Sequence, residues 1–430
     1  MNGPAPPGAG ASRCGIDSVT LARIDRLLRE TPAAYLGKLF SAVELADAGD
    51  GPGRVASLAA RFAAKEACLK LFPRETAMGH LGAADFSVVR DGYGAPQVEL
   101  SPDAQAVLDR HRIASVSLSL THDAQSASAV ALGVPVGTQV PLLGGLLYAF
   151  LPVRRQVILE NLQRVFGGTV PPAEIVRIAQ AHYAHLARMI FEFLRYPFVR
   201  AHRRLAMARV ENLDVLVREH AKGRGVLVLT GHFGNFEVAT AAAIAQYPEA
   251  RGKFFFVRRP FKPQWLDDIV TRRFAAAGFG ILPKSSSLDG LLDRLTAGDI
   301  VVVPFDQHAG PRDGVRVDFF GHPAGTFKSL AVIAQSTGAP VLPGSSWREP
   351  DGTHVLRFEP PLALVELENV SEEIRRNTRT FNAALERMIL RHPEQWWWVH
   401  RRWKPWPEKP RRAAPARDAA AANAGSERGR

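Results

Sequence analysis

Between residues 225 and 346, short apolar runs alternate with helical stretches, and this alternation constrains the fold more than any other feature. The apolar runs are GVLVLT (225–230), KFFFVRR (253–259), GDIVVVPFD (298–306) and PVLPGSS (340–346). Strands that alternate with helices form a sheet that is covered by helices on both faces. We therefore expect residues 141–407 to form an α/β domain with a mixed sheet flanked by helices, and its part before Glu219 to be mainly helical.

Residues 13–133 have a different order of elements and are expected to form a separate α+β domain. A helix rich in Ala, Leu and Lys is predicted over residues 57–72. The turn DGYGAP, flanked by ADFSVVRD and APQVELS, is typical of a hairpin. Alternating strands are then predicted over residues 114–123 and 126–133.

The two ends and the junction lack the pattern of a packed element. Residues 1–12 are rich in Pro, Gly and Ala and have no apolar core of a signal peptide, so we expect a disordered leader. Gly and Pro punctuate a linker expected over residues 134–140. Residues 408–430 are polar and rich in Ala and Arg, and they are expected to form a disordered basic tail.

Membrane contact is open from the sequence alone. No run of about 18–20 apolar residues predicts a spanning helix, and the nearest candidate, Val140 to Val153, has the length of an interfacial or a buried segment. The net charge of +12 favours an acidic partner. No nucleic-acid module is recognisable, so we expect no nucleic-acid partner. The two cysteines, Cys14 and Cys68, fit a reducing cytosol.

Two carboxylates of the first segment, Asp17 and Glu66, are candidates for holding a divalent cation. Mg²⁺ takes few oxygen ligands from protein and the others from water and substrate phosphates. Lys65 and Lys70 lie near Glu66 on the predicted helix, and lysine supplies a point charge for phosphate. The set suits a metal–pyrophosphate substrate. Alternatively, Glu66 and Lys70 only form an i,i+4 pair that stabilises the helix by about 0.2–0.5 kcal/mol.

A series of motifs covers this segment in order: GIDSVTLARI, LFSAVE, RFAAKEACLK, DGYGAP and SLTHD. As a set they resemble the holo-acyl-carrier-protein synthase family of 4′-phosphopantetheinyl transferases. The resemblance implies that Asp17 and Glu66 hold Mg²⁺ on the pyrophosphate of the substrate coenzyme A. It also implies that Lys70 approaches phosphate and that Glu66 takes the proton of a carrier-protein serine.

The same resemblance assigns further contacts. The residues implied to line the coenzyme A pocket are Gly94, Pro96, Ser119, Thr121 and His122. Arg23, with Arg26, is implied to contact the acidic recognition helix of an acyl carrier protein. Small members of the family are trimers with sites between subunits, which implies a homotrimer through the first domain.

The second segment contains TGHFGNFEVAT directly after the apolar run VLVLT. On one continuous helix His232 and Glu237 would diverge by about 140°. Gly231 and Gly234 allow a loop, however, with Glu237 in the first helical turn, where the two side chains could meet. An imidazole oriented by a carboxylate is a competent general base for an alcohol that attacks a thioester. The alternative is an ordinary loop histidine and a glutamate at a helix start.

Motifs from residue 154 onward also occur in order: RRQVILENLQRVF, TGHFGNFE, VRRP, PFDQHAG, VDFFGHPAGT and HPEQWWWVHRRWK. They resemble the lipid A biosynthesis acyltransferase family. In that family the H-x4-D/E pair is catalytic, which implies this role for His232 and Glu237. Arg259 is implied to bind acceptor phosphate or donor, and Asp306 with Gln307 is implied to shape the site. The absence of G-x-S-x-G favours direct transfer without an acyl-enzyme.

Two features depart from this second family or leave alternatives. Arg258 stands where tyrosine is usual, and the N-terminal hydrophobic anchor is shortened to Val140 to Val153. An aromatic–basic mix near the C-terminus suits either a membrane interface or a core strand with a solvated end. It consists of Trp396 to Trp398, Arg401, Arg402 and Lys404.

The sequence therefore predicts a bifunctional transferase. One half would transfer 4′-phosphopantetheine from coenzyme A to an acyl-carrier-protein serine with Mg²⁺. The other would transfer an acyl chain from acyl carrier protein or coenzyme A to a hydroxyl of a membrane lipid, such as a lipid A precursor. The expected location is the cytoplasmic side of the inner membrane, as a peripheral or monotopic protein. Two alternatives stay open: one half only recruits carrier protein, or the acceptor is a lysophospholipid or a specialised lipid.

Overall fold

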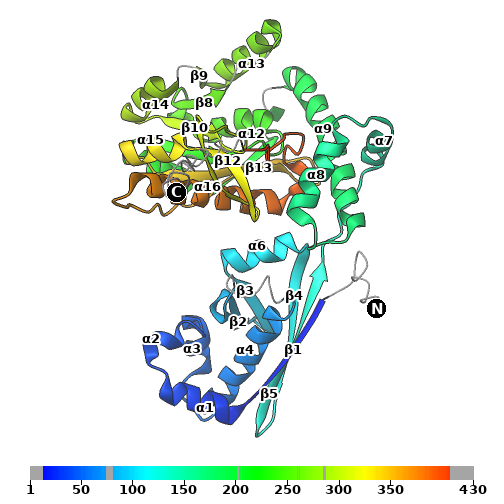
Figure 1. Cartoon of the computed structure of the whole chain (residues 1–430), viewed down its shortest axis with the longest axis vertical. Coiled ribbons are helices and arrows are strands. Elements are labelled where there is room, and N and C mark those ends of the chain that lie inside the picture. Colours follow the sequence, from blue (N-terminus) through cyan, green and yellow to red (C-terminus); the bar gives the residue numbers. More distant parts are fainter. Residues whose placement is uncertain are drawn as a thin grey trace, which may run out of the picture.

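The computed structural model consists of two lobes stacked along the long axis of the molecule (Figure 1). The first lobe ends with strand β5, and the second begins with helix α7. The structure describes residues 13–73, 81–200, 203–204, 206–258, 260, 262–283 and 287–406.

The first lobe combines an antiparallel sheet with a layer of helices, as expected for an α+β domain. The three-stranded sheet has the order β1-β5-β4, formed by β1 (Arg13–Thr20), β4 (Ile113–His122) and β5 (Ser126–Pro135). The predicted hairpin pairs β2 (Phe86–Arg90) with β3 (Pro96–Leu100). The helices are α1 (Leu21–Glu30), α2 (Ala33–Leu36), α3 (Ala42–Ala48), α4 (Arg54–Leu69) and α6 (Pro102–Arg110).

Helix α4 packs on one face of this sheet at very short range. A Cβ on Gly15 of β1 would lie 2.0 Å from the carbonyl oxygen of Ala67, so glycine is required at this contact. The opposite face of the sheet is uncovered and exposes Ile16, Val130 and Leu132 to solvent. The first lobe therefore buries one face of its sheet and leaves an apolar strip on the other.

The second lobe contains a seven-stranded mixed sheet of order β6-β14-β13-β7-β10-β8-β9 within the described residues, which confirms the expected fold class. Only β13 and β14 pair antiparallel among these neighbours. The strands are β6 (Ala208–Glu211), β7 (Val226–Thr230), β8 (Phe254–Arg258), β9 (Phe279–Pro283), β10 (Ile300–Pro304), β13 (Val341–Arg348) and β14 (His354–Phe358). A separate hairpin joins β11 (Gly314–Phe319) and β12 (His322–Phe327).

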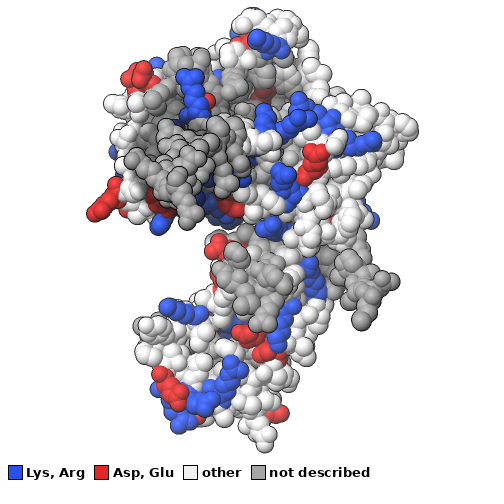
Figure 2. All heavy atoms as spheres, in the orientation of Figure 1, with Lys and Arg blue, Asp and Glu red and all other residues white. Residues whose placement is uncertain are grey.

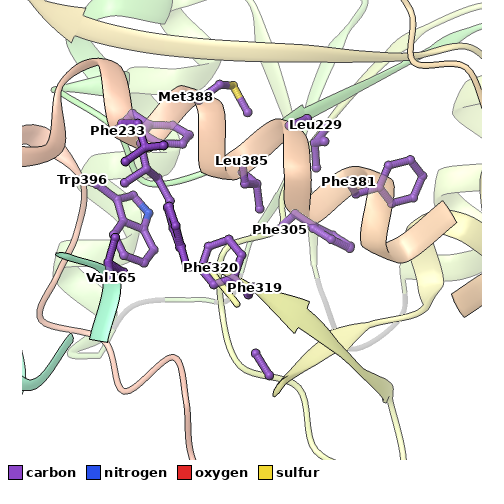
Figure 3. Packing of buried hydrophobic residues seen from close by; sticks show 14 of the residues in the cluster. Val165, Leu229, Phe233, Phe305, Phe319, Phe320, Phe381, Leu385, Met388 and Trp396 are labelled. Atoms are coloured by element: carbon purple, nitrogen blue, oxygen red, sulfur yellow. The ribbon is translucent and has the colours of Figure 1, made fainter. Parts of the chain in front are cut away.

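Helices cover both faces of this sheet, because its central strands are apolar on both sides. Val228 of β7 packs in one cluster with α11, α12 and α13, and Leu227 and Leu229 pack in the other with α14, α15 and α16. Figure 3 shows Phe381 and Leu385 projecting from α16 into the second cluster. The covering helices are α11 (Leu213–His220), α12 (Phe236–Ala243), α13 (Gln264–Ala277), α14 (Ser287–Thr296), α15 (Ser329–Thr337) and α16 (Val370–Arg391).

Helices α7 (Leu142–Phe150), α8 (Arg155–Phe166) and α9 (Pro172–Arg195) precede the sheet in the chain and lie at its side (Figure 1). No single helix of the described residues is long and apolar enough to span a membrane. The pair α7 and α8 passes that test together by length and composition, with a bend of 117° between them.

A polar joint connects the two lobes. Glu174 at the start of α9 is buried and accepts a hydrogen bond from the backbone N–H of Thr138 at 2.9 Å. Arg112 of the first lobe donates to Oγ1 of Thr138 at 2.9 Å, and Arg13 donates to the carbonyl oxygen of Thr169 at 3.1 Å. Strand β5 runs to Pro135, so the linker expected over residues 134–140 begins inside the sheet.

Candidate active sites

His232 and Asp306 lie side by side because each follows a parallel strand by two residues. Strand β7 ends at Thr230 and β10 at Pro304, and these two residues are register partners. Nδ1 of His232 lies 2.9 Å from Oδ1 of Asp306, and the backbone N–H of His232 donates to Oδ2 at 2.7 Å. The imidazole is 24% exposed, whereas the carboxylate is fully buried. This edge, at the carboxyl ends of parallel strands, is where open α/β sheets usually bind ligands.

The Asp306 carboxylate is held in its ionised form. Burial alone would raise the pKa of Asp306, but the charge of His232 and the hydrogen bonds from His232 and Trp396 outweigh it and hold that pKa well below its usual value. Nε1 of Trp396 donates to Oδ2 at 2.9 Å. An ionised carboxylate only accepts, so Nδ1 of His232 carries the proton and Nε2 is the nitrogen that can accept one.

The loop that carries His232 is fixed by the backbone on both sides. The carbonyl oxygen of His232 accepts the N–H of Trp397 at 3.1 Å, and the N–H of Gly234 donates to the carbonyl oxygen of Gln395 at 2.9 Å. Gly234 has a φ of +53°, and a Cβ there would approach a carbonyl oxygen of β13 to 2.8 Å, so glycine is required. Phe233 points into the core cluster (Figure 3).

The carboxylate on Nδ1 of His232 is that of Asp306, which corrects the expectation that Glu237 orients the imidazole. Glu237 is in the first turn of α12, as predicted, but it lines a separate cavity of about 360 Å³ with Tyr196 and Arg273. Burial raises the pKa of Glu237 to about 7, although Arg273 and Arg258 act against the rise. A catalytic role for Glu237 stays a prediction.

Replacing Glu237 with glutamine is expected to stabilise the protein at about pH 8 by about 1–3 kcal/mol and to change little at about pH 5. The pKa of Glu237 is raised from 4.5 to about 7, so its contribution to stability is fully present below about 4.5 and is lost as the pH rises through 7. Glutamine mimics the protonated form. Thermal or denaturant unfolding at both pH values measures the effect, with the exposed Glu249→Gln as control. Equal effects of both substitutions at both pH values would contradict the buried, protonated state.

An apolar cavity of about 800 Å³ extends from His232 along α12. Phe236, Thr240 and Ile244, spaced four residues apart, form its wall on the helix side. The wall on the sheet side includes Val228, Phe256, Val302, Gly344 and Leu356. The lining is almost entirely apolar, so the cavity is suited to a hydrocarbon chain whose reacting end lies at His232.

The C-terminal tryptophans are core residues rather than a membrane belt. Trp396 and Trp398 are 1% and 0% exposed, and Arg402 is fully buried. Arg402 donates to the carbonyl oxygen of Gly325 at 2.7 Å and to Oγ1 of Thr326 at 2.8 Å, which ties the chain end to the β11–β12 hairpin. Of the two interpretations left open by the sequence, these contacts favour the core, although Trp397 is half-buried and residues 396–402 form no strand.

This C-terminal segment also completes the surroundings of His232, which the sequence did not predict. The rings of His400 and His232 lie 5.5 Å apart, edge to face. Burial lowers the pKa of His400 to about 4, so the ring is neutral at physiological pH. Gln307, predicted with Asp306, follows it directly and is half-buried. Arg259 lies outside the described residues.

In the first lobe, Asp17 and Lys70 meet at the C-terminal end of α4. Nζ of Lys70 donates to Oδ1 of Asp17 at 2.7 Å and to the carbonyl oxygen of Ile16 at 2.8 Å. Glu66 lies one turn before Lys70 on α4, so its side chain is expected on the same side of the helix. The tight packing of Gly15 on Ala67 positions Asp17, two residues on, over this turn.

Lys65 is not placed to contact a substrate. Its side chain is 0% exposed and forms an ion pair with the equally buried Glu44 at 2.6 Å, and Nζ also donates to the carbonyl oxygen of Ala83 at 3.1 Å. The expectation of a coenzyme A contact is therefore wrong. The helical period could have indicated this burial. Lys65 lies seven residues, or two turns, from both Leu58 and Phe72, so it is on the buried side of the helix with them.

The other predicted residues of the first lobe lie on its surface. Gly94 has a φ of +84° in the turn before Pro96, which begins β3. Ser119 and His122 are exposed on β4, and Arg23 is exposed on α1. Within one chain, the structure does not bring these residues together with Asp17 into one cavity among those described.

The described residues contain no group of three or more His, Cys, Asp or Glu side chains placed to hold a metal ion. Mg²⁺, however, commonly takes only one or two protein carboxylates and completes its shell with water and phosphate. Asp17 and Glu66 fit such a donor set, and the ammonium of Lys70 now occupies the position beside Asp17 that a cation would share.

Comparison with known proteins assigns the two lobes separately. Residues 13–129 match the model of the 4′-phosphopantetheinyl transferase superfamily, and residues 130–405 match that of the bacterial lipid A biosynthesis acyltransferases. The holo-[acyl-carrier-protein] synthase of Chlorobaculum parvum is 35% identical over 123 residues, which cover 28% of this chain and 97% of the relative.

Relatives of the second lobe carry different names. The phosphatidylinositol mannoside acyltransferase of Mycolicibacterium smegmatis is 29% identical over 257 residues, covering 57% of this chain and 78% of the relative. The lipid A biosynthesis lauroyltransferase of Escherichia coli is 25% identical over 268 residues, covering 62% and 84%. The chain therefore belongs to the bacterial lipid A biosynthesis acyltransferase family through its second lobe and to the 4′-phosphopantetheinyl transferase superfamily through its first, and it is a fusion of two transferases.

Proposed function

We propose that the second lobe transfers an acyl chain from a thioester to a hydroxyl of a membrane lipid, with His232 as general base. The observation that carries this proposal is the contact between His232 and the buried Asp306 at one end of an apolar cavity. The acyl chain occupies the cavity, and its thioester carbonyl lies at Nε2 of His232.

The transfer proceeds in one displacement. Nε2 of His232 takes the proton of the acceptor hydroxyl while the acceptor oxygen bonds to the thioester carbonyl carbon. The C–S bond then breaks, and the proton passes from His232 to the leaving thiolate. Asp306 holds the imidazole in the tautomer that accepts at Nε2 and stabilises the imidazolium that forms.

The length of the cavity is expected to set the preferred acyl chain. Helix α12 rises by roughly 10 Å from Phe236 to Ala243 at about 1.5 Å per residue, and the cavity continues past the end of the helix to Tyr247. Replacing Thr240 with tryptophan fills the middle of this wall.

We expect Thr240→Trp to lower kcat/KM for a long-chain donor by roughly 10–200-fold and to affect a short-chain donor much less. Competition between donors of different chain length, read by product mass, measures the shift. Thr240→Ser keeps the hydroxyl that donates to the carbonyl oxygen of Phe236 at 2.6 Å and serves as the matched control. An equal loss with all donors would place the acyl chain elsewhere.

We propose that the first lobe transfers 4′-phosphopantetheine from coenzyme A to a serine of an acyl carrier protein. Asp17 and Glu66 would hold Mg²⁺, which, when bound, neutralises charge on the pyrophosphate. Glu66 takes the serine proton, the serine oxygen bonds to the phosphorus that bears pantetheine, and the pyrophosphate bond breaks to release the nucleotide. When substrate binds, the ammonium group of Lys70 exchanges its contact with Asp17 for one with the substrate phosphate, for which it is a suitable point charge.

The first lobe is proposed to assemble as a homotrimer whose site lies between subunits. The uncovered sheet face supports this, because Ile16, Val130 and Leu132 present an apolar strip beside the exposed Ser119 of β4. Gly94, Pro96 and His122 would then complete the coenzyme A pocket across the interface. Light scattering that gave a monomer under assay conditions would contradict this assembly.

The acceptor is proposed to be a membrane glycolipid or phospholipid with a free hydroxyl, reached from the cytoplasmic face of the inner membrane. The relatives named for lipid A and for a phosphatidylinositol mannoside support a sugar-bearing acceptor. A lysophospholipid or another specialised lipid is the alternative acceptor, and product analysis with each acceptor class separates them.

The two activities are tested by separate readouts on the full chain. With apo carrier protein, coenzyme A and Mg²⁺, the carrier should gain the mass of one phosphopantetheine. With acylated carrier and lipid acceptor, the lipid should gain one acyl group. If only one readout responds, the silent lobe has the alternative role of recruiting carrier protein.

A further inference from the structure

The second half of helix α9 and the 3₁₀ turn η2 (Tyr196–Phe198) expose a row of large apolar side chains. We call the set Ile190, Phe191, Leu194 and Phe198 the α9 surface. Phe198 is 86% exposed, Leu194 61% and Phe191 59%. Exposed apolar residues are normal when scattered, but a contiguous set on one element marks an interaction surface.

Helix α7 extends this apolar region. It packs on α9 so closely that a Cβ on Gly144 would lie 2.4 Å from the carbonyl oxygen of Gln180. Figure 1 shows α7 on the outer side of α9. On α7, Leu142 and Phe150 are more than four-fifths exposed, at 83% and 82%, and Leu146 is half exposed. The stretch from residue 140 to 153 contains no charged residue, so nothing on α7 opposes contact with an apolar phase.

The charges next to the α9 surface are basic. From residue 186 to 204 the basic side chains are Arg188, Arg195, Arg200, Arg203 and Arg204. Figure 2 shows mainly Lys and Arg side chains, with some acidic atoms among them, over the part of the second lobe where α8 and α9 lie. The only acidic residue of this stretch is Glu192, whose side chain turns into the protein. Residues 186–204 thus combine exposed aromatic and aliphatic groups with arginines and have no fully exposed acid, which is the composition of an interfacial helix on anionic lipid.

On the inner side of α9, Glu192 contacts the protein core. Its Oε2 lies 2.6 Å from an Arg348 nitrogen and accepts a hydrogen bond from Nδ2 of Asn235 at 3.0 Å. Asn235, three residues after His232, also caps α12: its Oδ1 accepts a hydrogen bond from the N–H of Val238 at 3.4 Å. One helix therefore presents apolar groups outward and holds the His232 loop inward, so the catalytic loop lies roughly one helix diameter, about 10–12 Å, from the α9 surface.

We propose that the α9 surface, together with the exposed side of α7, docks on an anionic lipid bilayer and thereby brings the His232 site to its acceptor. The proposal rests on the proposed acyl transfer to a membrane lipid and adds the surface that makes the contact. The apolar groups enter the interface, and the arginines bind lipid phosphates. Arg195 and Arg200 flank the row and are exposed.

Co-sedimentation of the full chain with vesicles tests the docking without any catalysis. We expect binding to vesicles of equal parts phosphatidylethanolamine and phosphatidylglycerol, and weaker binding to phosphatidylcholine alone. The double variant Phe191→Ser/Phe198→Ser should bind at least roughly tenfold more weakly to both. The double variant Arg195→Gln/Arg200→Gln should lose only the part of binding that depends on phosphatidylglycerol. Tyr35→Ser, at an exposed aromatic of the first lobe, should bind like the unchanged protein.

The outcomes separate docking from catalysis. His232→Ala should bind vesicles normally and fail to transfer acyl groups, whereas Phe191→Ser/Phe198→Ser should still transfer to an acceptor in detergent micelles. Unchanged unfolding midpoints show that the variants are folded. Undiminished vesicle binding by the double phenylalanine variant would overturn the proposal. A smaller assembly of that variant than of the unchanged protein in light scattering would also overturn the proposal. The α9 surface would then be a contact between copies of the chain rather than a membrane contact.

Discussion

Replacing His232 with alanine lowers acyl transfer by roughly 10²–10⁴-fold and leaves phosphopantetheine transfer by the same molecule unchanged. The loss follows because the imidazole is the group placed to take the acceptor proton, with its Nδ1 on an ionised carboxylate. Product formation with saturating donor and acceptor measures the first activity, and the mass of the carrier protein measures the second. The second activity belongs to the other lobe and serves as the internal control for protein amount, and an unchanged unfolding midpoint shows that the mutated lobe is folded.

Asp306→Asn tests which carboxylate orients His232. Asparagine keeps the size of the side chain but removes the charge, and its amide can stabilise the wrong imidazole tautomer. We expect a loss approaching that of His232→Ala, since Oδ1 and Oδ2 both contact His232. If Glu237→Gln caused this loss and Asp306→Asn did not, the assignment of the orienting carboxylate to Asp306 would be wrong.

Asp17→Asn and Glu66→Gln should each lower phosphopantetheine transfer by at least roughly 10²-fold without affecting acyl transfer. Each substitution removes one of the two carboxylates that we propose to hold the cation, of which Asp17 contacts Lys70. A stronger requirement for added Mg²⁺ should accompany the loss. Glu99→Gln, at an exposed glutamate on β3, is the matched control and should behave like the unchanged protein. If either site variant kept full activity, the proposed role of that carboxylate would be wrong.

The position of His232 could be predicted from the sequence, but its partner could not. An apolar run followed by Gly and His indicates the end of a strand, and both β7 and the loop are where the pattern places them. The local pattern points to Glu237, because it is the carboxylate nearest to His232 in the sequence. Asp306 follows β10, which comes after β8 and β9 along the chain and yet pairs directly with β7. Strand order depends on packing of the whole sheet and is not encoded in the local pattern.

Burial explains the other differences between expectation and structure. Lysine is rarely buried unless it is paired, and the pair of Lys65 with Glu44 joins helices whose contact no local pattern predicts. Trp396 and Arg402 have the composition of an interface, but the hydrogen bond to Asp306 and those to the β11–β12 hairpin hold them in the core. In both cases the residue type was compatible with two environments, and a tertiary partner decided between them.

The stacking of the two lobes affects how a carrier protein would move between them. Helix α1, with Arg23, lies at the end of the first lobe that is remote from the second (Figure 1). If Arg23 binds the carrier, as the resemblance of the first lobe implies, the carrier is separated from the His232 site by the length of that lobe. Covalent linkage keeps the two lobes in equal number, but a carrier loaded at α1 would then have to leave, collect its acyl chain and return through bulk solution. On that prediction the fusion would provide a fixed stoichiometry and a shared location rather than private delivery of the intermediate.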